Sequence, residues 1–510
     1  MELVAKAIVV VLYIVAMILI GYWSMRRTQN VGDFFIGGRT IGPWISAMAY
    51  GTTYFSAVLF VGFAGKLGWG FGLNALWIAL GNAVVGTWLA WKMLAIPTRE
   101  MTERLDAITM PEFLAARYGI GWLKALSALV IFIFLVPYSA SVYTGLAHLF
   151  EVNLGIDYLQ AVIFMAALTG VYLVMGGYFA VTTTDFIQGL MQVFGVILMI
   201  LLLAAATGKG VIGAALEVAG PDSAPGLAPK PDALFPGWLM LASLVFMTSV
   251  GPFGLPQMVQ KFYSIKSRDV VRRGMLVATA FSVLIAFGAY YCGALSHHFF
   301  TGPDLPQGPK GPDFDKIVPQ MLTEHTPGWF SVIILLVVLA ASMSTLASLV
   351  LVSSAAIAVD LAGARDSRDK SSKQGLTLLR VLCGVFVALS VIIAATKPAG
   401  IVTLMSMSWG ALAGAFIGPY VWGLYCRRIT AAGAAAGFLC GLGAAVALYF
   451  AWGAANSPVA AAIAMIVSLI ATPVVSLVSP QLPADRIARA FGDEVEPAIA
   501  ETETAGEEMP

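Results

Sequence analysis

Charged side chains are scarce in this chain, and their scarcity determines its class. Of the 510 residues, 11% are charged and 59% are hydrophobic, whereas a soluble globular chain carries about 25% charged residues. A chain of this composition has too little polar surface to face water on all sides. The net charge of +1 provides no basic field that would attract nucleic acid. The sequence therefore predicts a polytopic protein in a lipid bilayer, with no nucleic-acid partner.

Catalytic and metal-binding motifs are also missing. The four cysteines lie in or at the ends of apolar runs without CxxC spacing, which indicates neither a disulfide framework nor a zinc site. No HExxH, GxSxG or P-loop motif occurs, so an intramembrane protease or an ATP-driven pump would lack its chemistry. We therefore expect that the chain is not an enzyme.

Long apolar runs dominate the chain instead. A helix needs about 20 apolar residues to cross the hydrocarbon core of a bilayer. An all-α fold with about thirteen membrane-spanning helices is predicted, at residues 5–25, 42–72, 73–97, 120–150, 156–175, 177–207, 236–264, 270–299, 328–362, 375–396, 398–424, 431–451 and 456–478.

The basic residues predict the orientation, because cytoplasmic loops carry the excess of Lys and Arg. With the N-terminus outside, all sixteen arginines fall on cytoplasmic loops or helix ends, whereas seven lysines remain outside. The arginines include Arg26, Arg27, Arg39, Arg268, Arg272, Arg273, Arg365, Arg368, Arg380, Arg427 and Arg428, and the outer lysines are Lys6, Lys66, Lys209, Lys230, Lys310, Lys316 and Lys397. We expect the N-terminus outside and the C-terminus in the cytoplasm.

Two spans look interrupted. AYGTTYFS (49–56) places a glycine beside two β-branched threonines, and TSVGPFGLP (248–256) contains two glycines and two prolines. Either stretch could be a kink whose freed backbone groups are satisfied by neighbouring helices. Transporters with inverted repeats, however, break helices at corresponding positions of their two halves and bind ions and substrate there. These spans are five apart, and the Pro/Gly-rich segment 208–235 lies just before the second, which favours the functional interpretation.

The division of the chain follows from this spacing. The spans form two halves of five helices and opposite topology, with one helix before them and two after. After residue 479 comes a short tail that ends in EVEPAIAETETAGEEMP. This tail is acidic, lacks apolar periodicity and is expected to be disordered. The predicted parts are an N-terminal helix and loop (1–41), a first repeat (42–207), an external linker (208–235), a second repeat (236–424), two C-terminal helices (425–478) and a cytoplasmic tail (479–510).

Hydroxyl groups are concentrated in LAASMSTLASL (339–349). At about 100° per residue, Ala341, Ser344, Thr345 and Ser348 fall within one wedge of a helix, and Ser342 points elsewhere. Such a stripe can serve close helix packing, with each hydroxyl bonded to a carbonyl one turn earlier. It can also bind a hard monovalent cation, which needs several oxygen ligands.

Asp185 lies about nine residues inside the sixth span, where an ionisable group is costly. It could be an interfacial aspartate near the cytoplasmic mouth, or it could bind a cation or carry a proton.

Four stretches together resemble the sodium:solute symporters, the family of the glucose, proline, pantothenate and sialic acid cotransporters. They are YIVAMILIGYWSMRRTQNVGDFFIGGRTIGP (13–43), GGYFAVTTTDFIQG (176–189), LAASMSTLASLVLVSSAAIAVDL (339–361) and the region 408–437 beginning SWGALAGAFIGPYVWGLYCRRIT. The resemblance implies the five-plus-five inverted-repeat (LeuT-like) fold in a bacterial-type plasma (inner) membrane. The N-terminal part is most similar to bacterial sodium/proline symporters.

The resemblance also implies a sodium site between the first helix of the first repeat and the third helix of the second. Thr52, Phe55 and Ala341 would contribute carbonyl oxygens, and Ser344 and Thr345 would contribute hydroxyls. Some members have a second sodium site, which here would use Asp185 with Ser344, Thr345 and Ser348. Ala347 lacks a hydroxyl that some members use at this second site.

The solute is less well specified by the resemblance. Tyr138 and Ser56 match residues of the proline carriers, but Tyr54 replaces an aspartate, and Thr248 and Pro252 replace a tryptophan and a tyrosine. These departures argue against proline and are compatible with a carboxylate or another small polar solute, such as an amino acid. The residues expected to face the solute are Tyr54, Ser56, Tyr138, Thr248 and Phe253.

The predicted function is sodium-coupled import of a small polar organic solute by alternating access, with Na+ as the coupling ion. Two alternatives remain open at this point: a proton-coupled carrier of the same fold in which Asp185 titrates, and a transporter-like sensor that binds solute without moving it.

Overall fold

The computed structural model describes residues 2–25, 31–229, 231–308, 311–363 and 373–493, and they form a helical bundle. Its α-helices are α1 (Glu2–Met25), α2 (Val31–Ile36), α3 (Pro43–Tyr54), α4 (Ala64–Phe71), α5 (Leu76–Ala83), α6 (Ala90–Arg104), α7 (Met110–Tyr118), α8 (Gly121–Leu154), α9 (Tyr158–Ala206), α10 (Gly210–Glu217), α11 (Gly237–Val250), α12 (Pro256–Tyr263), α13 (Arg268–Ala294), α14 (Ser296–Phe299), α15 (Ile317–His325), α16 (Gly328–Ala355), α17 (Lys373–Thr396), α18 (Ile401–Tyr425), α19 (Ala431–Trp452), α20 (Ser457–Val478) and α21 (Ala484–Phe491).

Shorter elements connect or extend these helices. Three π-helical segments are η2 (Val58–Phe63), η4 (Val84–Leu89) and η9 (Ala356–Leu361), and the 3-10 turns include η3 (Gly72–Ala75), η6 (Gly251–Phe253) and η8 (Phe314–Lys316). Two short antiparallel strands, β1 (Gln307–Gly308) and β2 (Gly311–Pro312), form a hairpin before η8.

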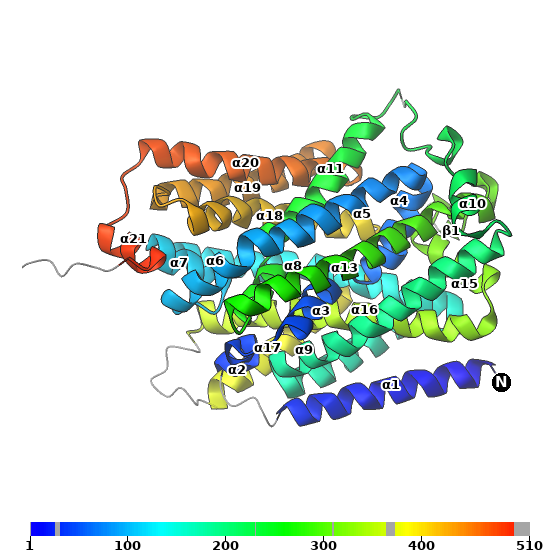
Figure 1. Cartoon of the computed structure of the whole chain (residues 1–510), viewed down its shortest axis with the longest axis horizontal. Helices are drawn as coiled ribbons and strands as arrows, with labels where there is room; N and C mark the ends of the chain where they lie inside the picture. Colours follow the sequence, from blue (N-terminus) through cyan, green and yellow to red (C-terminus); the bar gives the residue numbers. More distant parts are fainter. Residues whose placement is uncertain (1, 26–30, 230, 309–310, 364–372, 494–510) are drawn as a thin grey trace, which may run out of the picture.

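The long helices lie side by side along the longest axis of the molecule (Figure 1). The N-terminus lies at the right end of the view, the same end as α10, β1 and α15, whereas α2, α7 and α21 lie at the left end. Helices α18, α19 and α20 pack on one another, and α1 packs on α9. The two ends of the described chain therefore lie at opposite ends of the bundle.

Ten segments of the described residues are long and apolar enough to cross a membrane, and two shorter apolar helices, Ile8–Ser24 and Tyr158–Gly170, accompany them. One of the ten, Val58–Arg104, has 47 residues and would be about 70 Å long as one straight helix. This exceeds twice the hydrocarbon thickness of about 30 Å, and the chain turns within it at Gly72, whose φ is +54°. The all-α polytopic fold is confirmed, and the count of thirteen spans stays a prediction.

Helix α9 also contains two predicted spans. Its backbone leaves the helical region at Gly177, with φ 56° and ψ −149°, a conformation that only glycine adopts readily. A Cβ atom there would lie 2.7 Å from the Phe34 ring. The change of direction at this residue places Asp185 in the second part of α9, two turns after the kink.

Both predicted helix breaks are confirmed. Helix α3 ends at Tyr54, Phe55 has the extended conformation (φ −109°, ψ 96°), and helical structure resumes at η2. Helix α11 ends at Val250 and continues through η6 to an extended Leu255, after which α12 begins at Pro256. Local glycine and proline content thus produces two places where main-chain groups are free of helical hydrogen bonds.

The expectation of a disordered tail from residue 479 is wrong for its first part. Residues 484–491 form α21, which the chain holds through polar contacts to earlier segments. Arg104 donates to the carbonyl oxygen of Ala490 at 3.0 Å, and Arg427 forms an ion pair with Asp493 at 2.5 Å. Residues 494–510 lie outside the described residues, as do Arg26, Arg27, Arg365, Arg368, Lys230 and Lys310 of the orientation argument.

Candidate cation and solute site

The first helix break meets the middle of α16 through main-chain oxygens and hydroxyls. Ser344 and Thr345 each donate a hydrogen bond to the carbonyl oxygen of Thr52, both at 3.1 Å. The same two hydroxyls lie 3.0 and 3.2 Å from the carbonyl oxygen of Ala341. Thr345 also lies 3.3 Å from the carbonyl oxygen of Thr53. Two hydroxyls and several carbonyl oxygens therefore converge at the C-terminal end of α3.

This cluster has the chemistry of a site for a small monovalent cation. Its side chains are completely buried, its ligand atoms are neutral oxygens, and the negative end of the α3 dipole points at it. Carbonyl and hydroxyl oxygens of this kind can replace the hydration shell of an ion. Phe55 directly follows α3 in the break, but none of the hydrogen bonds of this cluster involves it.

Ser342 belongs to the other side of α16. Its hydroxyl donates to the carbonyl oxygen of Val338, one turn earlier, at 2.6 Å. As the helical period predicted, Ser342, whose hydroxyl bonds within α16, lies on a different face of the helix from Ser344 and Thr345, whose hydroxyls contact α3.

Asp185 and Ser348 meet a residue that the sequence analysis missed. The Lys261 ammonium lies 3.4 Å from Asp185 Oδ2 and 2.9 Å from Ser348 Oγ. Ser348 in turn lies 3.0 Å from the hydroxyl of Thr53. The sequence feature that could have identified Lys261 is its position: it lies inside a predicted apolar span, five residues after the last proline of the break.

A small cavity borders the break on the side of the aromatic residues. Its volume is about 20 Å³, which accommodates one water molecule, so a solute can enter only after side chains move. Twelve residues line it: Tyr54, Phe55, Ser56, Val58, Leu59, Phe63, Asn82, Tyr138, Thr248, Tyr290, Met405 and Trp409.

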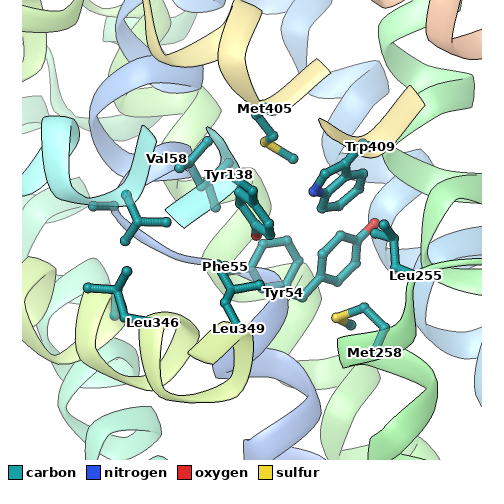
Figure 2. Packing of buried hydrophobic residues seen from close by; sticks show 14 of the residues in the cluster. Tyr54, Phe55, Val58, Tyr138, Leu255, Met258, Leu346, Leu349, Met405 and Trp409 are labelled. Carbon is teal, nitrogen blue, oxygen red and sulfur yellow. The ribbon is translucent and has the colours of Figure 1, made fainter. Parts of the chain in front are cut away.

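Aromatic rings form the wall of this cavity. Figure 2 shows Tyr54, Tyr138 and Trp409 turned toward one another, with Met405 nearby. The Tyr54 ring stacks on Trp409 with centroids 6.2 Å apart, and Tyr138 meets Trp409 edge-on at 5.9 Å. The Tyr54 hydroxyl donates to the carbonyl oxygen of Thr248 at 2.5 Å, which joins the first helix break to the end of α11.

Four of the five residues predicted to face the solute line this cavity, namely Tyr54, Ser56, Tyr138 and Thr248. Phe253 is buried in η6 but is not among the lining residues. The sequence analysis missed Trp409, whose ring lies close to Gly251: a Cβ atom on that glycine would be 2.9 Å from it. It also missed Asn82, Tyr290 and Met405, because a single aromatic residue, amide or methionine in an apolar run carries no local signal for a cavity.

Broken helices that bring neutral oxygens together beside a buried cavity are typical of ion-coupled membrane transporters. The sequence profile of the sodium:solute symporter family matches residues 34–441. The chain is 30% identical over 434 residues to the sodium/proline symporter of Escherichia coli (strain K12), covering 84% of each chain. It is 28% identical to the osmoregulated proline transporter OpuE of Bacillus subtilis (strain 168), covering 94% of this chain and 96% of that protein. The chain therefore belongs to the sodium:solute symporter family.

The fold has a counterpart among solved structures. A Na+-coupled sialic acid symporter, solved in a substrate-bound outward-open state, superposes with a TM-score of 0.76 at 19% identity, over 93% of this chain and 98% of that one. The chain therefore has this fold. As a member of the sodium:solute symporter family, it is a multi-pass membrane transporter, not an enzyme, and it couples movement of a small solute to Na+.

Proposed function

We propose that Thr52, Phe55, Ala341, Ser344 and Thr345 bind the coupling sodium ion. The observation that carries this proposal is the convergence of two buried hydroxyls from α16 on the Thr52 carbonyl oxygen at the end of α3. Phe55 is included because it lies in the extended break, where a main-chain carbonyl has no helical hydrogen bond to make.

The solute binds in the cavity lined by Tyr54, Ser56, Tyr138 and Thr248, after it opens. Segment 52–56 would then serve both ligands, since Thr52 belongs to the sodium site and Tyr54 and Ser56 to the solute wall. Sodium that orders this break lowers the cost of forming the solute site, and by linkage the solute raises the affinity for sodium. Alternating access then moves both together.

The solute carries a carboxylate, as a monocarboxylate or a zwitterionic amino acid does. No acidic or basic side chain is among the residues that line the cavity. With one sodium ion bound nearby, a cationic solute would add a second uncompensated positive charge, whereas a carboxylate would be attracted. Hydroxyl and amide groups of the wall would hydrogen-bond the remaining polar atoms.

The orientation and the division of the chain complete the proposal. The N-terminus lies outside and the C-terminus in the cytoplasm of a bacterial-type plasma (inner) membrane, so that the inward sodium gradient drives import. The opposite ends of the bundle at which the N-terminus and α21 lie support this arrangement. The repeats are residues 42–207 and 236–424, joined by the linker 208–235, with 1–41 before them and 425–478 and 479–510 after them.

A ligand screen tests the function directly. The purified protein is heated with amino acids, monocarboxylates, vitamins or sugars, in sodium or in potassium, because a ligand stabilises by about 2.7 kcal/mol at a hundred times its Kd. We expect a carboxylate-bearing solute to raise the melting temperature in sodium only. Uptake of that solute into proteoliposomes must then follow an imposed sodium gradient. Accumulation driven by a pH gradient alone would contradict sodium coupling, and binding without accumulation would indicate a sensor.

A further inference from the structure

Lys261 carries a positive charge in a place from which it cannot reach water. All eight residues of α12 are buried, and the Lys261 side chain is 1% exposed. A lysine near a membrane surface normally extends its stem so that the ammonium stays hydrated. Here the surrounding helices enclose the whole side chain, so the charge must be compensated inside the protein.

The surroundings of the ammonium are those of a bound cation. Asp185 Oδ2 and Ser348 Oγ lie 3.4 and 2.9 Å from Nζ, and the Tyr178 ring centroid lies 5.5 Å away, within the range of a cation–π contact. The Asp185 side chain is fully buried. Asp185 and Lys261 thus neutralise each other, which is the arrangement that a buried charge requires.

This position is the one at which a second sodium ion would bind. Asp185 and Ser348 are the carboxylate and the hydroxyl assigned to such a site from the family resemblance, and Lys261 Nζ contacts both. A sodium ion between the same two groups would lie within about 4 Å of the ammonium, where like charges repel strongly in a poorly polarisable interior.

We propose that the Lys261 ammonium is a built-in cation that takes the place of a second sodium ion, so that this symporter binds one sodium ion per chain. The inference rests on the proposed sodium site of Thr52, Ser344 and Thr345, and it deepens that proposal by stating how many ions the protein binds. Lys261 thereby determines the stoichiometry of coupling.

The fixed cation is linked to the proposed sodium site through hydroxyls. Ser348 contacts Lys261 on one side and the Thr53 hydroxyl on the other, and the Thr53 carbonyl oxygen accepts from Thr345. Helix α12 packs on α3, and Figure 2 shows Leu255, just before α12, and Met258, within it, on the same side of the view as Tyr54. The short helix that carries Lys261 therefore contacts the cation sites and the solute wall.

Binding of radioactive sodium (22Na+) to the purified full-length protein tests the proposal without knowledge of the solute. The wild-type protein is expected to bind one sodium ion per chain, with a Hill coefficient of one. Lys261→Met keeps much of the volume and removes the charge, which leaves Asp185 unpaired. Asp185 Oδ1 has no hydrogen-bond partner among the described residues, so both carboxylate oxygens become available to an ion. This variant should bind two sodium ions per chain.

Three further variants control the experiment. Lys261→Arg retains a positive charge and should bind one ion. The double variant Lys261→Met/Asp185→Asn has no buried charge to compensate and should return from two ions to one. Lys266→Met removes the charge of an exposed lysine beyond the end of α12 and should leave the count at one. Thermal unfolding shows which variants are folded.

The outcomes separate this inference from the proposed function. Two sodium ions on the wild-type protein, or one ion on folded Lys261→Met, would overturn the inference and leave the symport mechanism intact. If Lys261→Met does not fold, the number of sodium ions bound by the wild-type protein and by the double variant still tests the inference, because two ions on either protein would overturn the inference. Sodium binding that survives loss of the Ser344 and Thr345 hydroxyls would instead overturn the proposed sodium site.

Discussion

The hydroxyl of Thr345 in α16 donates to the main-chain carbonyl oxygen of Thr52 at the end of α3, at 3.1 Å, although the two residues are 293 positions apart. The contact is completely buried and joins a helix with an intact hydrogen-bond ladder to one that stops two residues later. A main-chain carbonyl oxygen at a helix C-terminus and an uncharged hydroxyl are ligands that a monovalent cation can use without leaving a permanent charge behind.

The first prediction concerns these hydroxyls. Replacing both Ser344 and Thr345 by alanine should raise the sodium concentration for half-maximal binding or transport at least ten-fold. A contact between a charged group and a polar partner contributes about 1.5–3 kcal/mol, and each 1.4 kcal/mol is a factor of about ten. The measurement is the sodium-dependent shift of the melting temperature, together with sodium-driven uptake.

Ser342→Ala is the matched control, because Ser342 is buried in the same helix but, among the described residues, its hydroxyl bonds only to the carbonyl oxygen of Val338. It should retain the sodium response of the wild-type protein. An unchanged sodium response in the double variant would show that these hydroxyls do not bind the ion.

Much of the candidate cation site could be predicted because its signals are local. Glycine and proline weaken helices wherever they occur, so the breaks near Thr52 and Pro252 are visible in the sequence. The helical period alone places Ser344 and Thr345 on one face and Ser342 on another. The family motifs then associate that face with α3, which no local pattern could do.

The pairing of Lys261 with Asp185 could not be predicted in this way. The residues lie on different helices, 76 positions apart, and a lysine near the predicted end of a span is ordinarily interfacial. Trp409 was missed for a similar reason, since an aromatic residue in an apolar run is usually part of the core. Phe253 was expected in the cavity because of its place in the break, but it is buried in η6 and is not among the residues that line the cavity.

The second prediction concerns the solute cavity. Tyr138→Phe should raise the KM for the solute found in the thermal screen about five- to ten-fold, because a hydrogen bond from the wall contributes about 1 kcal/mol. Sodium binding in the absence of solute should change little, since no hydrogen bond among the described residues joins Tyr138 to Ser344 or Thr345. Uptake kinetics in proteoliposomes and 22Na+ binding measure the two effects separately.

Tyr143→Phe is the control for this substitution. Tyr143 is equally buried in α8 but does not line the cavity, so its variant should keep the wild-type KM. Equal effects of the two variants on KM would place the solute elsewhere.

The third prediction concerns a close contact between helices. A Cβ atom on Gly293 of α13 would lie 2.1 Å from the carbonyl oxygen of Ala64 in α4, and main-chain atoms cannot move aside as a flexible side chain can. Gly293→Ala should therefore destabilise the protein by about 1–3 kcal/mol, the usual cost of overpacking. Its melting temperature should fall by a few degrees.

Gly384→Ala is the control, for which we expect no loss of stability or a gain. Gly384 lies within α17, and a Cβ atom there would meet nothing within 4 Å. Alanine is favoured over glycine inside a helix by up to about 1 kcal/mol, so this variant should be as stable as the wild type or more so. A fall in its melting temperature equal to that of Gly293→Ala would refute the close-contact explanation.

The fourth prediction concerns Asp315, which lies in the short 3-10 turn η8 between helices α14 and α15. Burial raises the pKa of its carboxyl above the ordinary value, and the nearby Asp313 raises it further. His148 and the hydrogen bond from the Ile401 main-chain N–H lower this pKa, but their effects are smaller than that of burial. From about pH 4 upward, the folded protein thus retains a proton that the unfolded chain has lost. The free energy of unfolding should therefore fall as the pH rises through this window and become level above the folded-state pKa.

Asp315→Asn removes the titrating group while its amide oxygen can still accept the hydrogen bond from Ile401. Melting temperatures measured from pH 4 to pH 7 should consequently decline less in this variant than in the wild type. Asp222→Asn, which alters an exposed aspartate of another loop, should follow the wild-type profile. Parallel profiles for wild type and Asp315→Asn would mean that Asp315 makes no such contribution, because only a proton bound more tightly in the folded state can produce the difference in slope.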